Sequence, residues 1–372
     1  MLFCFHRAAP VLGFLNMSLT GERNLKNMSK QKPDYILLAV IIALVLFGLI
    51  ILISVSAEEP YYIKHQILYG ILIGSVGFFV AYKINYKIWQ KLALPFLVLS
   101  LILLGLIFIP KIGISYGGAK RWLQIGFIFQ PGEIVKLSFI IFLASLLANK
   151  TKLVPFLAWT SLIVLLFIFQ PDIGTMSLII LIAVIIYFTA GAKLWQIGVC
   201  FFSGIAALFV LIKLSAYRLN RVWTFLYSKL DPQGISYQIN QALIALGSGG
   251  FLGLGWGYSQ QRVFLPAVVT DSIFAVLGEE LGFAGTMILV ILFFVLALRG
   301  FKIAIISSDQ FARLLAVGIT SWLVLQAFVN IMAITGLIPL TGIPLPFISY
   351  GSTSMIMCLF GAGILLNISR YT

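Results

Sequence analysis

The sequence contains little charge for its length. Of its 372 residues only 10% are charged and 61% are hydrophobic, whereas an average soluble domain has about 25% charged residues. So few polar residues cannot cover an aqueous surface, which excludes a soluble globule, and the apolar content excludes a disordered chain. The composition indicates a polytopic membrane protein.

Histidine and cysteine are also scarce. The two histidines are His6 and His65, and the three cysteines, Cys4, Cys200 and Cys358, are far apart. These spacings provide neither a disulfide framework nor a zinc site, and so little histidine argues against Ser-His-Asp hydrolysis. The sequence also lacks Gly-Lys-Ser/Thr and Asp-x-Asp. Neither ATP use nor a glycosyltransferase that holds its metal through such an aspartate pair is indicated.

Ten apolar segments meet, or nearly meet, the roughly 17–25 residues needed to cross a bilayer. We therefore expect an all-α polytopic membrane protein of about ten transmembrane helices, with a long extracytoplasmic loop over about 214–272 between helices 7 and 8. Residues 1–33 are interpreted as a cytoplasmic tail, extended by an upstream start site, and 34–372 as the transmembrane domain. The segments run about 35–57, 66–82, 92–109, 133–149, 154–170, 172–190, 195–213, 273–298, 312–335 and 350–368.

Basic residues predict the orientation. The chain has 25 basic and 11 acidic residues, a net charge of +14. With both termini in the cytoplasm, fifteen basic residues lie in the tail and inner loops and four lie in the short outer loops. The long loop is left out because long translocated segments follow the positive-inside rule weakly. The positive charge is thus explained by topology, without nucleic acid as a partner.

Two motifs on the outer side of the third and fourth spans carry charge. Glu133 and Lys136 follow Gln130-Pro131 and are three residues apart, so they share a helix face. An ionisable residue inside a span is costly and is usually paired or functional. A self-neutralising salt bridge and a polar cavity shaped by the pair both remain open. Lys120 and Arg121, which precede Trp122, are suited to an anionic headgroup or to anchoring at the interface.

Carboxylates also gather at the outer ends of later spans. Asp172 and Asp271 lie where helices begin, so each could cap its helix, because a carboxylate there is favoured by the helix dipole. Glu279 and Glu280 lie about two turns further into the span. Their burial indicates a hydrated cavity or specific partners. Of all these positions Asp271 is our first candidate for chemistry.

Two further segments interrupt the helical pattern. The glycine-rich run 247–255 has Leu252 where the dinucleotide fingerprint requires glycine, so we expect a tight turn at the membrane surface. Pro344 and Pro346 precede the last span and prevent a regular helix there. We expect a re-entrant or surface turn over 343–347.

Nine short motifs follow one another along the chain. They are 119–122 (AKRW), 130–133 (QPGE), 170–175 (QPDIGT), 247–250 (GSGG), 265–266 (LP), 270–271 (TD), 273–276 (IFAV), 278–282 (GEELG) and 345–351 (LPFISYG). With ten spans and a long outer loop, they resemble the SEDS family of bacterial cell-wall proteins, which includes RodA and FtsW. The runs 237–247, 259–261 and 340–344 are more similar to FtsW, the division member.

The resemblance implies a peptidoglycan glycosyltransferase that polymerises lipid II, a disaccharide-pentapeptide on undecaprenyl pyrophosphate, at the outer face of the bacterial cytoplasmic membrane, for septal synthesis. The family's catalytic aspartate falls on Asp271, and a carboxylate can accept the proton of an attacking sugar hydroxyl. Lys120 and Arg121 are candidates to stabilise the pyrophosphate. No cofactor is required by the sequence, although Mg²⁺ or another divalent cation near Asp271 would be compatible with such a substrate.

The family resemblance also assigns cavity roles to Glu133, Lys136 and Asp172. It implies a class B penicillin-binding protein, which is a transpeptidase, and other divisome proteins as partners. The chain departs from the family pattern at Val269, where histidine is usual, and at Ser272, Gly132 and Ser352. Val269 leaves Asp271 without a neighbour that would orient it.

Three alternatives remain open: an elongation polymerase of the RodA type, a flippase for lipid-linked precursors, and a scaffold that activates a partner. Polar residues inside the membrane suit a flippase equally well. Against it, the acidic residues cluster near the outer end rather than the midplane, and no inverted repeat is visible. A scaffold role would not explain the free-energy cost of burying the carboxylates of Glu133, Glu279 and Glu280.

Overall fold

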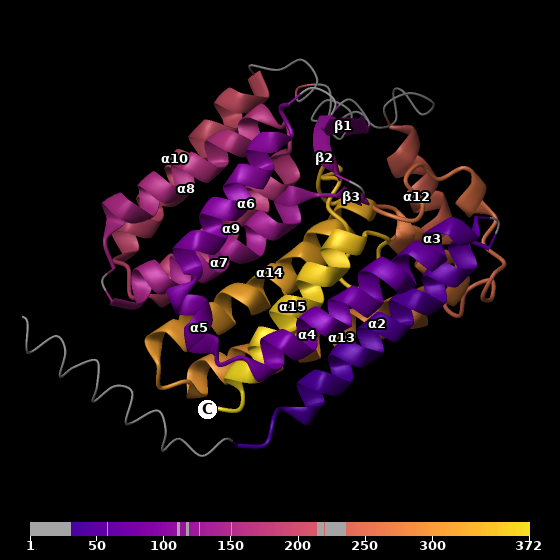
Figure 1. Cartoon of the computed structure of the whole chain (residues 1–372). Coiled ribbons are helices and arrows are strands. Elements are labelled where there is room, and N and C mark those ends of the chain that lie inside the picture. The colour runs from indigo at the N-terminus through magenta and orange to yellow at the C-terminus, as the bar shows by residue number, and fades with distance from the viewer. Residues whose placement is uncertain are drawn as a thin grey trace, which may run out of the picture.

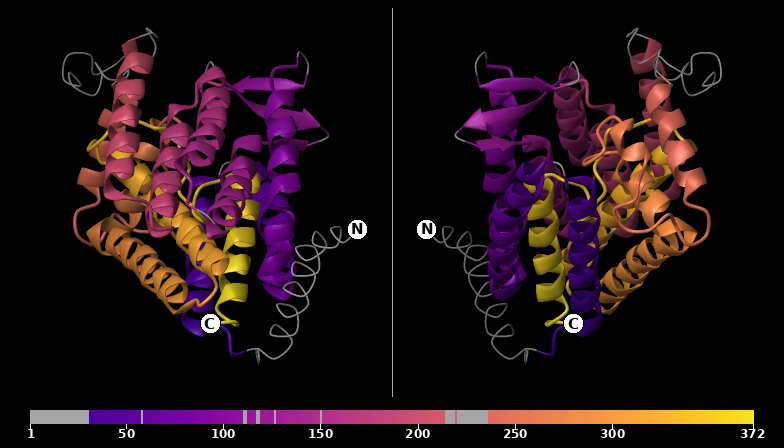
Figure 2. Two further views of the ribbon diagram at one scale, coloured as in Figure 1. Left: turned by 90° about the vertical axis from the view of Figure 1, so that its left-hand side faces the viewer. Right: turned by 90° about the vertical axis from the view of Figure 1, so that its right-hand side faces the viewer.

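The computed structural model describes residues 31–57, 59–109, 112–116, 119–125, 127–149, 151–213, 219 and 236–372. Most of the expected tail and much of the expected long loop lie outside these residues. The described chain is an elongated bundle of helices with one small sheet (Figure 1). The C-terminus lies at one end of the bundle and the sheet at the other, as the side views also show (Figure 2). The expected all-α polytopic fold is confirmed.

The elements follow the hydropathy of the sequence closely. The helices are α2 (Tyr35–Val55), α3 (Pro60–His65), the π-helix η1 (Gln66–Leu72), α4 (Ile73–Lys83), α5 (Tyr86–Lys91), α6 (Ala93–Leu106), α7 (Pro131–Asn149), α8 (Leu153–Phe169), α9 (Ile173–Thr189), α10 (Leu194–Lys213), α12 (Tyr237–Ser248), the 3₁₀ turn η2 (Gln261–Val263), α13 (Ile273–Ile306), α14 (Gln310–Ile334) and α15 (Ser352–Ile368). The strands are β1 (Gly113–Tyr116), β2 (Ala119–Ile125) and β3 (Phe127–Phe129).

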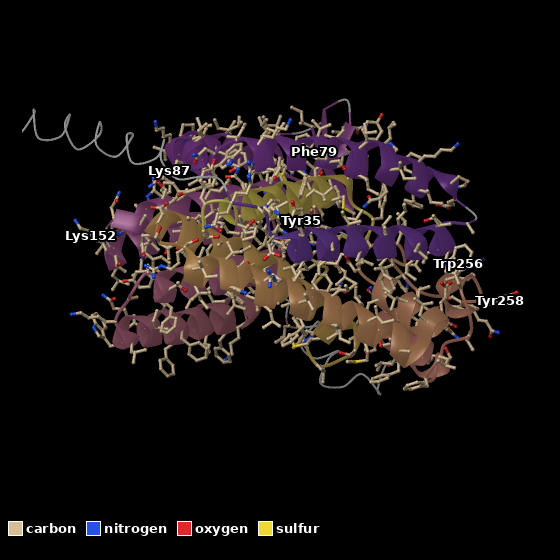
Figure 3. All side chains as sticks on the ribbon, turned by 90° about the horizontal axis from the view of Figure 1, so that it is seen from below. Tyr35, Phe79, Lys87, Lys152, Trp256 and Tyr258 are labelled. Atoms are coloured by element: carbon tan, nitrogen blue, oxygen red, sulfur yellow. The ribbon has the colours of Figure 1, made fainter. Side chains whose placement is uncertain are left out.

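The bundle has the properties of a multi-pass membrane protein. Five described helical segments are long and apolar enough to cross a membrane, and five shorter apolar helices accompany them. Each of the ten expected segments falls on one of these helices, while the number that crosses the bilayer remains a prediction. Many large apolar side chains are exposed along the outer faces. Lys87 and Lys152 lie toward one end of the bundle, and Trp256 and Tyr258 lie at the other (Figure 3).

Helix α14 is the centre of the bundle. It packs against α7, α9, α13 and α15, and small residues allow the close approach. Gly318 lies against Ile140 of α7 and Ile186 of α9, and Gly300 of α13 lies against Thr320. Without a hydrophobic driving force between helices in lipid, such small-residue contacts are a main source of helix association. Side chains on α14 are therefore well placed to hold segments from several parts of the chain.

The sheet was not expected from the sequence. Its strands pair antiparallel in the order β1-β2-β3, with Leu123 opposite both Gly113 and Phe129. It occupies the connection between α6 and α7, which we had treated only as an outer loop. The segment 335–351 forms no helix, as its prolines predict, and 343 and 345–349 are buried.

Helix α13 is broken at Gly282, whose φ of 64° and ψ of −163° are not helical. The glycine-rich segment 249–255 fills the break: Leu254 and Gly255 donate backbone hydrogen bonds to the carbonyls of Glu279 and Glu280 at 2.9 and 3.0 Å. In return Phe283 donates to Gly250 at 2.9 Å. The expected surface turn is thus a partner for the interrupted helix, because unpaired peptide groups are costly away from water.

Replacing Gly282 by alanine should destabilise the protein strongly. Its φ and ψ are essentially restricted to glycine, and a Cβ would overlap the backbone of Phe251 and Gly253. We expect the free energy of unfolding to fall by about 2–5 kcal/mol. Gly198→Ala in α10 is the control, since a Cβ there meets no described atom within 4 Å, and should change stability by less than about 1 kcal/mol. Thermal unfolding of the detergent-solubilised variants measures both, and equal effects would contradict the role of the break.

Candidate functional site

A cavity of about 150 Å³ opens at the end of the bundle that carries the sheet. It lies where β2, the start of α13, the non-helical segment 335–351 and the start of α15 meet. Its lining is mostly polar or glycine: Arg121, Trp122, Gln130, Thr270, Asp271, Gly342, Pro344, Tyr350, Gly351, Thr353 and Ser354. Segments that lie far apart in the sequence, around residues 121–130, 270–271 and 342–354, therefore form one site.

Asp271 and Arg121 face the same space. A methyl group on Gly342 would lie 3.6 Å from Oδ2 of Asp271 and 3.7 Å from Nη1 of Arg121. Gly342 has a φ of 69°, a conformation that favours glycine, and its missing side chain leaves this space open. A carboxylate and a guanidinium thus converge on a small cavity from β2 and from the segment before α13.

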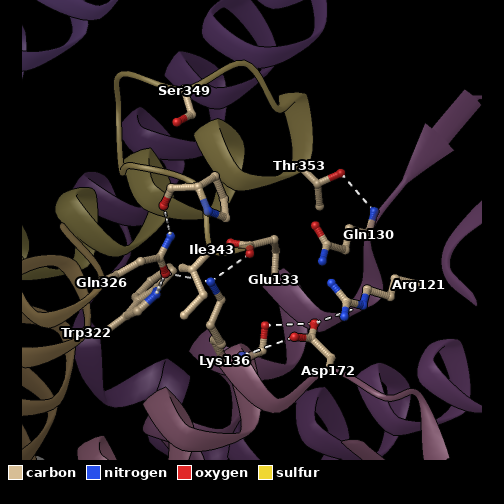
Figure 4. Close-up of polar contacts among 12 residues, drawn as sticks. Arg121, Gln130, Glu133, Lys136, Asp172, Trp322, Gln326, Ile343, Ser349 and Thr353 are labelled. Atoms are coloured by element: carbon tan, nitrogen blue, oxygen red, sulfur yellow. Dashed lines mark hydrogen bonds and ion pairs between the residues drawn. The ribbon is translucent and has the colours of Figure 1, made fainter. Parts of the chain in front are cut away.

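The turn before α9 fixes the orientation of the Arg121 side chain. Its Nη2 donates to the carbonyl of Pro171 at 2.8 Å, and its Nε lies 3.8 Å from Oδ2 of Asp172. Asp172 itself caps α9, accepting from the backbone N of Thr175 at 3.2 Å and from its hydroxyl at 2.9 Å. Asp172 therefore combines the expected capping role with a second one: it positions the guanidinium that reaches the cavity (Figure 4).

The backbone that carries Asp271 is held by three hydrogen bonds from other segments. Asn330 of α14 donates to the carbonyl of Asp271 at 3.0 Å, and the hydroxyl of Ser349 donates to the carbonyl of Thr270 at 2.6 Å. The backbone N of Tyr350 donates to the carbonyl of Val269 at 2.8 Å. These bonds fix residues 269–271 although no regular element contains them. Helix α13 begins only at Ile273, after Ser272, so Asp271 is not its N-cap.

Glu133 and Lys136 form the predicted salt bridge, with 2.7 Å between Nζ and Oε1, and both side chains are almost completely buried. Neither lines the cavity. Lys136 also donates to Oε1 of Gln326 at 2.6 Å, and Gln326 donates to the carbonyl of Pro344 at 2.9 Å (Figure 4). The ion pair therefore supports the cavity wall through an amide.

The sequence analysis missed Gln326 and Asn330. They are four residues apart on α14 and so share one helix face, and both donate to the segment that lines the cavity. Asn330 reaches the carbonyl of Ile343 at 2.8 Å in addition to that of Asp271. The available signal was two amides at helical spacing inside an apolar run, where a buried polar group needs partners.

The other predicted site residues lie elsewhere. Lys120 is exposed on β2 and is not part of the cavity lining. Glu279 accepts from the hydroxyl of Ser259 at 2.5 Å and from the backbone N of Gln260 at 3.0 Å. Glu280 accepts from the hydroxyl of Ser54. Both glutamates are fully buried, so the structure gives them specific protein partners and keeps them out of the Asp271 cavity.

The donor set at the cavity limits how a metal could be held. Among the described residues no three His, Cys, Asp or Glu side chains gather closely enough to bind a metal ion, and Asp271 is the one carboxylate in the described lining. These residues do not fit a permanently bound ion. They fit a Mg²⁺ ion that takes one carboxylate from the protein and its other ligands from substrate phosphates and water.

Comparison with known proteins places this arrangement in a family. A family model described as cell cycle protein, covering FtsW, RodA and SpoVE, matches residues 34–372. The chain belongs to the FtsW, RodA and SpoVE family. The predicted resemblance is therefore confirmed.

Individual relatives match over most of their length. A probable peptidoglycan glycosyltransferase FtsW of Trichlorobacter lovleyi is 38% identical, with 90% of this chain and 93% of that protein covered. The stage V sporulation protein E of Bacillus subtilis is 37% identical, with 92% and 98% covered. Among solved structures, one chain of a peptidoglycan synthase complex that coordinates polymerization and crosslinking is 26% identical with a TM-score of 0.80, covering 91% of this chain and 98% of that one. The RodA of Thermus thermophilus is 26% identical with a TM-score of 0.69, covering 92% and 99%.

The buried ion pair gives a stability prediction. Lys136→Met should lower the free energy of unfolding by about 3–5 kcal/mol, because it leaves the Glu133 carboxylate buried without its partner. The double variant Glu133→Gln/Lys136→Met should recover most of this loss. Thermal unfolding of the single and double variants in the same detergent forms a double-mutant cycle. Additive losses would show that the two side chains do not interact.

Proposed function

We propose that the protein is a peptidoglycan glycosyltransferase that polymerises lipid II into glycan strands at the outer face of the bacterial cytoplasmic membrane, for septal synthesis in cell division. The observation that carries the proposal is the cavity on which the Asp271 carboxylate and the Arg121 guanidinium converge. The names of the relatives, peptidoglycan glycosyltransferase FtsW among them, support the same reaction class. Both FtsW-named and sporulation relatives align at similar identity.

The reaction joins two lipid-linked saccharides. A hydroxyl of one sugar attacks the anomeric carbon of the other, a new C–O bond forms, and the bond to the lipid pyrophosphate breaks. The hydroxyl proton passes to the carboxylate of Asp271, which acts as general base. The leaving pyrophosphate gains negative charge, which the guanidinium of Arg121 stabilises. Arg121 suits this role because Pro171 and Asp172 already fix its orientation, so little reorganisation is needed.

A divalent cation fits this scheme as a companion of the substrate. Mg²⁺ binds one or two carboxylates together with substrate phosphates, and it would supply further neutralisation of the pyrophosphate. Asp271 is the protein residue that would hold it, with hydroxyls of Thr270 and Thr353 in the same lining.

The membrane orientation follows from the charge distribution. With the termini in the cytoplasm, the end that carries the cavity lies on the extracytoplasmic side, where lipid-linked saccharide is polymerised. We propose a class B penicillin-binding protein as the partner that crosslinks the product, together with other divisome proteins. The synthase complex to which this chain is similar supports such a partner, since it couples polymerization to crosslinking.

The central test is polymerisation of lipid II by the full chain with its transpeptidase, for wild type and Asp271→Asn. Loss of the base should reduce the rate by about 100-fold or more, with an unchanged thermal unfolding midpoint as the control for folding. Chains from both proteins would remove Asp271 from the mechanism. Chains from neither, with folded protein and partner present, would favour the flippase or scaffold.

Asn330→Ala should lower kcat with little change in KM. Losing the bonds to the carbonyls of Asp271 and Ile343 lets the carboxylate drift, and small displacements of a catalytic group cost about 10–100-fold in rate. Asn367→Ala is the matched control: Asn367 is also a buried asparagine that bonds two backbone groups, N of Tyr86 and O of Tyr82, at the opposite end of the bundle.

The two asparagine variants should lose similar stability but differ in activity. Polymerisation rates per folded molecule, with unfolding midpoints measured in parallel, separate the effects. An equal fall in kcat for both variants would reduce Asn330 to a purely structural residue. Rescue of activity by Asn330→Gln, which keeps the amide donor, would strengthen the positioning role.

A further inference from the structure

A second and larger cavity, of about 320 Å³, lies directly beside the first. It is formed by the end of α2, the start of α3, the turn η2 and the segment 265–269. Its volume is within the range of about 300–1,000 Å³ that is common for ligand sites. None of its lining residues was singled out as a site residue from the sequence.

The two cavities share one wall. Residues 267–269 line the second cavity, and the next two residues, Thr270 and Asp271, line the first. The ring of Tyr62 in the second cavity meets the ring of Tyr350 in the first edge to face, with 5.0 Å between centroids. The backbone stretch 267–271 and the Tyr62–Tyr350 pair therefore belong to the walls of both cavities.

The lining of the second cavity combines donors and acceptors. Glu59 provides an acceptor carboxylate, and Arg262 provides a guanidinium that is anchored by a 3.2 Å bond from Nη1 to the carbonyl of Ser54. The hydroxyl of Ser56 is buried and has no hydrogen-bond partner among the described residues. Glu59 and Arg262 are the charged groups that the lining offers to a ligand.

The chemistry of the lining selects the class of ligand. A lining that holds both a carboxylate and a guanidinium disfavours a simple anion or a simple cation. Saccharide hydroxyls both donate and accept, which matches an acceptor-only carboxylate and a donor-only guanidinium in one lining. The apolar remainder, including Val268 and Val269, can contact the ring carbons and acetamido methyl groups of an N-acetylated sugar.

We propose that the second cavity binds a saccharide unit of the glycan, next along the strand from the sugar that reacts at Asp271. This inference rests on the proposed function and adds to it a subsite for the growing strand. A polymerase that holds a neighbouring unit keeps the strand between additions, so the cavity should determine glycan length more than the rate of a single bond.

The test uses Glu59→Lys in the full chain, with Lys64→Glu as the matched control. Both residues are exposed and lie at or near α3, yet only Glu59 lines the cavity. Loss of a charged hydrogen-bond partner should weaken binding of short peptide-free glycan strands about tenfold or more. Glu59→Lys should also shorten the polymerised glycan severalfold, whereas Lys64→Glu should leave its length unchanged.

A cavity-filling pair guards against effects of charge alone. Val263 lines the cavity, so Val263→Trp should fill part of it. The next residue, Phe264, is also exposed but does not line the cavity, so Phe264→Trp is the control. Shortened glycan and weakened strand binding from Val263→Trp only would support the subsite. Glycan of wild-type length from both Glu59→Lys and Val263→Trp would overturn it.

Two further outcomes separate this inference from the proposed function. Strand binding is measured without turnover. A wild-type protein that is inactive but binds strands in a Glu59-dependent way would contradict the proposed polymerase function and support the saccharide site. An active wild type whose peptide-free strand binding is unaffected by Glu59→Lys would support the polymerase and overturn the cavity. Binding that requires the peptide stems of the strands would also overturn a saccharide site.

Discussion

The constraint on which the structure depends is that non-helical backbone inside a membrane bundle needs partners for its peptide groups. The site is made of such backbone: residues 269–271 and the segment 335–351 leave the helical pattern. Their carbonyls are paired by Asn330 and Gln326 of α14, and by Ser349 of the segment 335–351 itself. Where a helix itself is interrupted, at Gly282, the glycine-rich segment 249–255 supplies the missing partners. These bonds hold the segments that line the cavity.

Backbone strain accumulates around the same place. Among the described residues, the non-glycine residues with positive φ are Pro171, Ala267 and Phe347. Pro171 presents its carbonyl to Arg121, Ala267 lines the second cavity, and Phe347 lies in the segment between Pro344 and Tyr350. For Ala267 and Phe347 such a conformation costs about 1–3 kcal/mol and persists only where the surroundings impose it. This strain lies in the segments that carry or adjoin Asp271.

Hydropathy alone predicted where the helices lie, because apolar runs of sufficient length have few alternatives in a bilayer. Local spacing predicted the Glu133–Lys136 pair and the Asp172 cap because each depends on residues of a single helix. Contacts between segments that are distant in the sequence could not be predicted in this way. Lys120 and Arg121 were equal candidates in a loop, but on a strand successive side chains point to opposite faces, so they separate. Glu279 and Glu280 were expected near a cavity, yet the carboxylate of Glu279 accepts from Ser259 and Gln260 and that of Glu280 accepts from Ser54 of α2.

The buried ion pair illustrates how the bundle connects distant parts of the site. A salt bridge inside protein is not stabilising in itself, because the desolvation of two charges offsets their attraction. Here Lys136 also donates to Gln326, whose amide holds the carbonyl of Pro344. One turn along the same face of α14, about 6 Å away, Asn330 holds Asp271. Consecutive turns of a single helix therefore tie the ion pair, the cavity wall and the carboxylate into one rigid layer. The pair supports the wall that Asp271 faces and does not itself line the cavity.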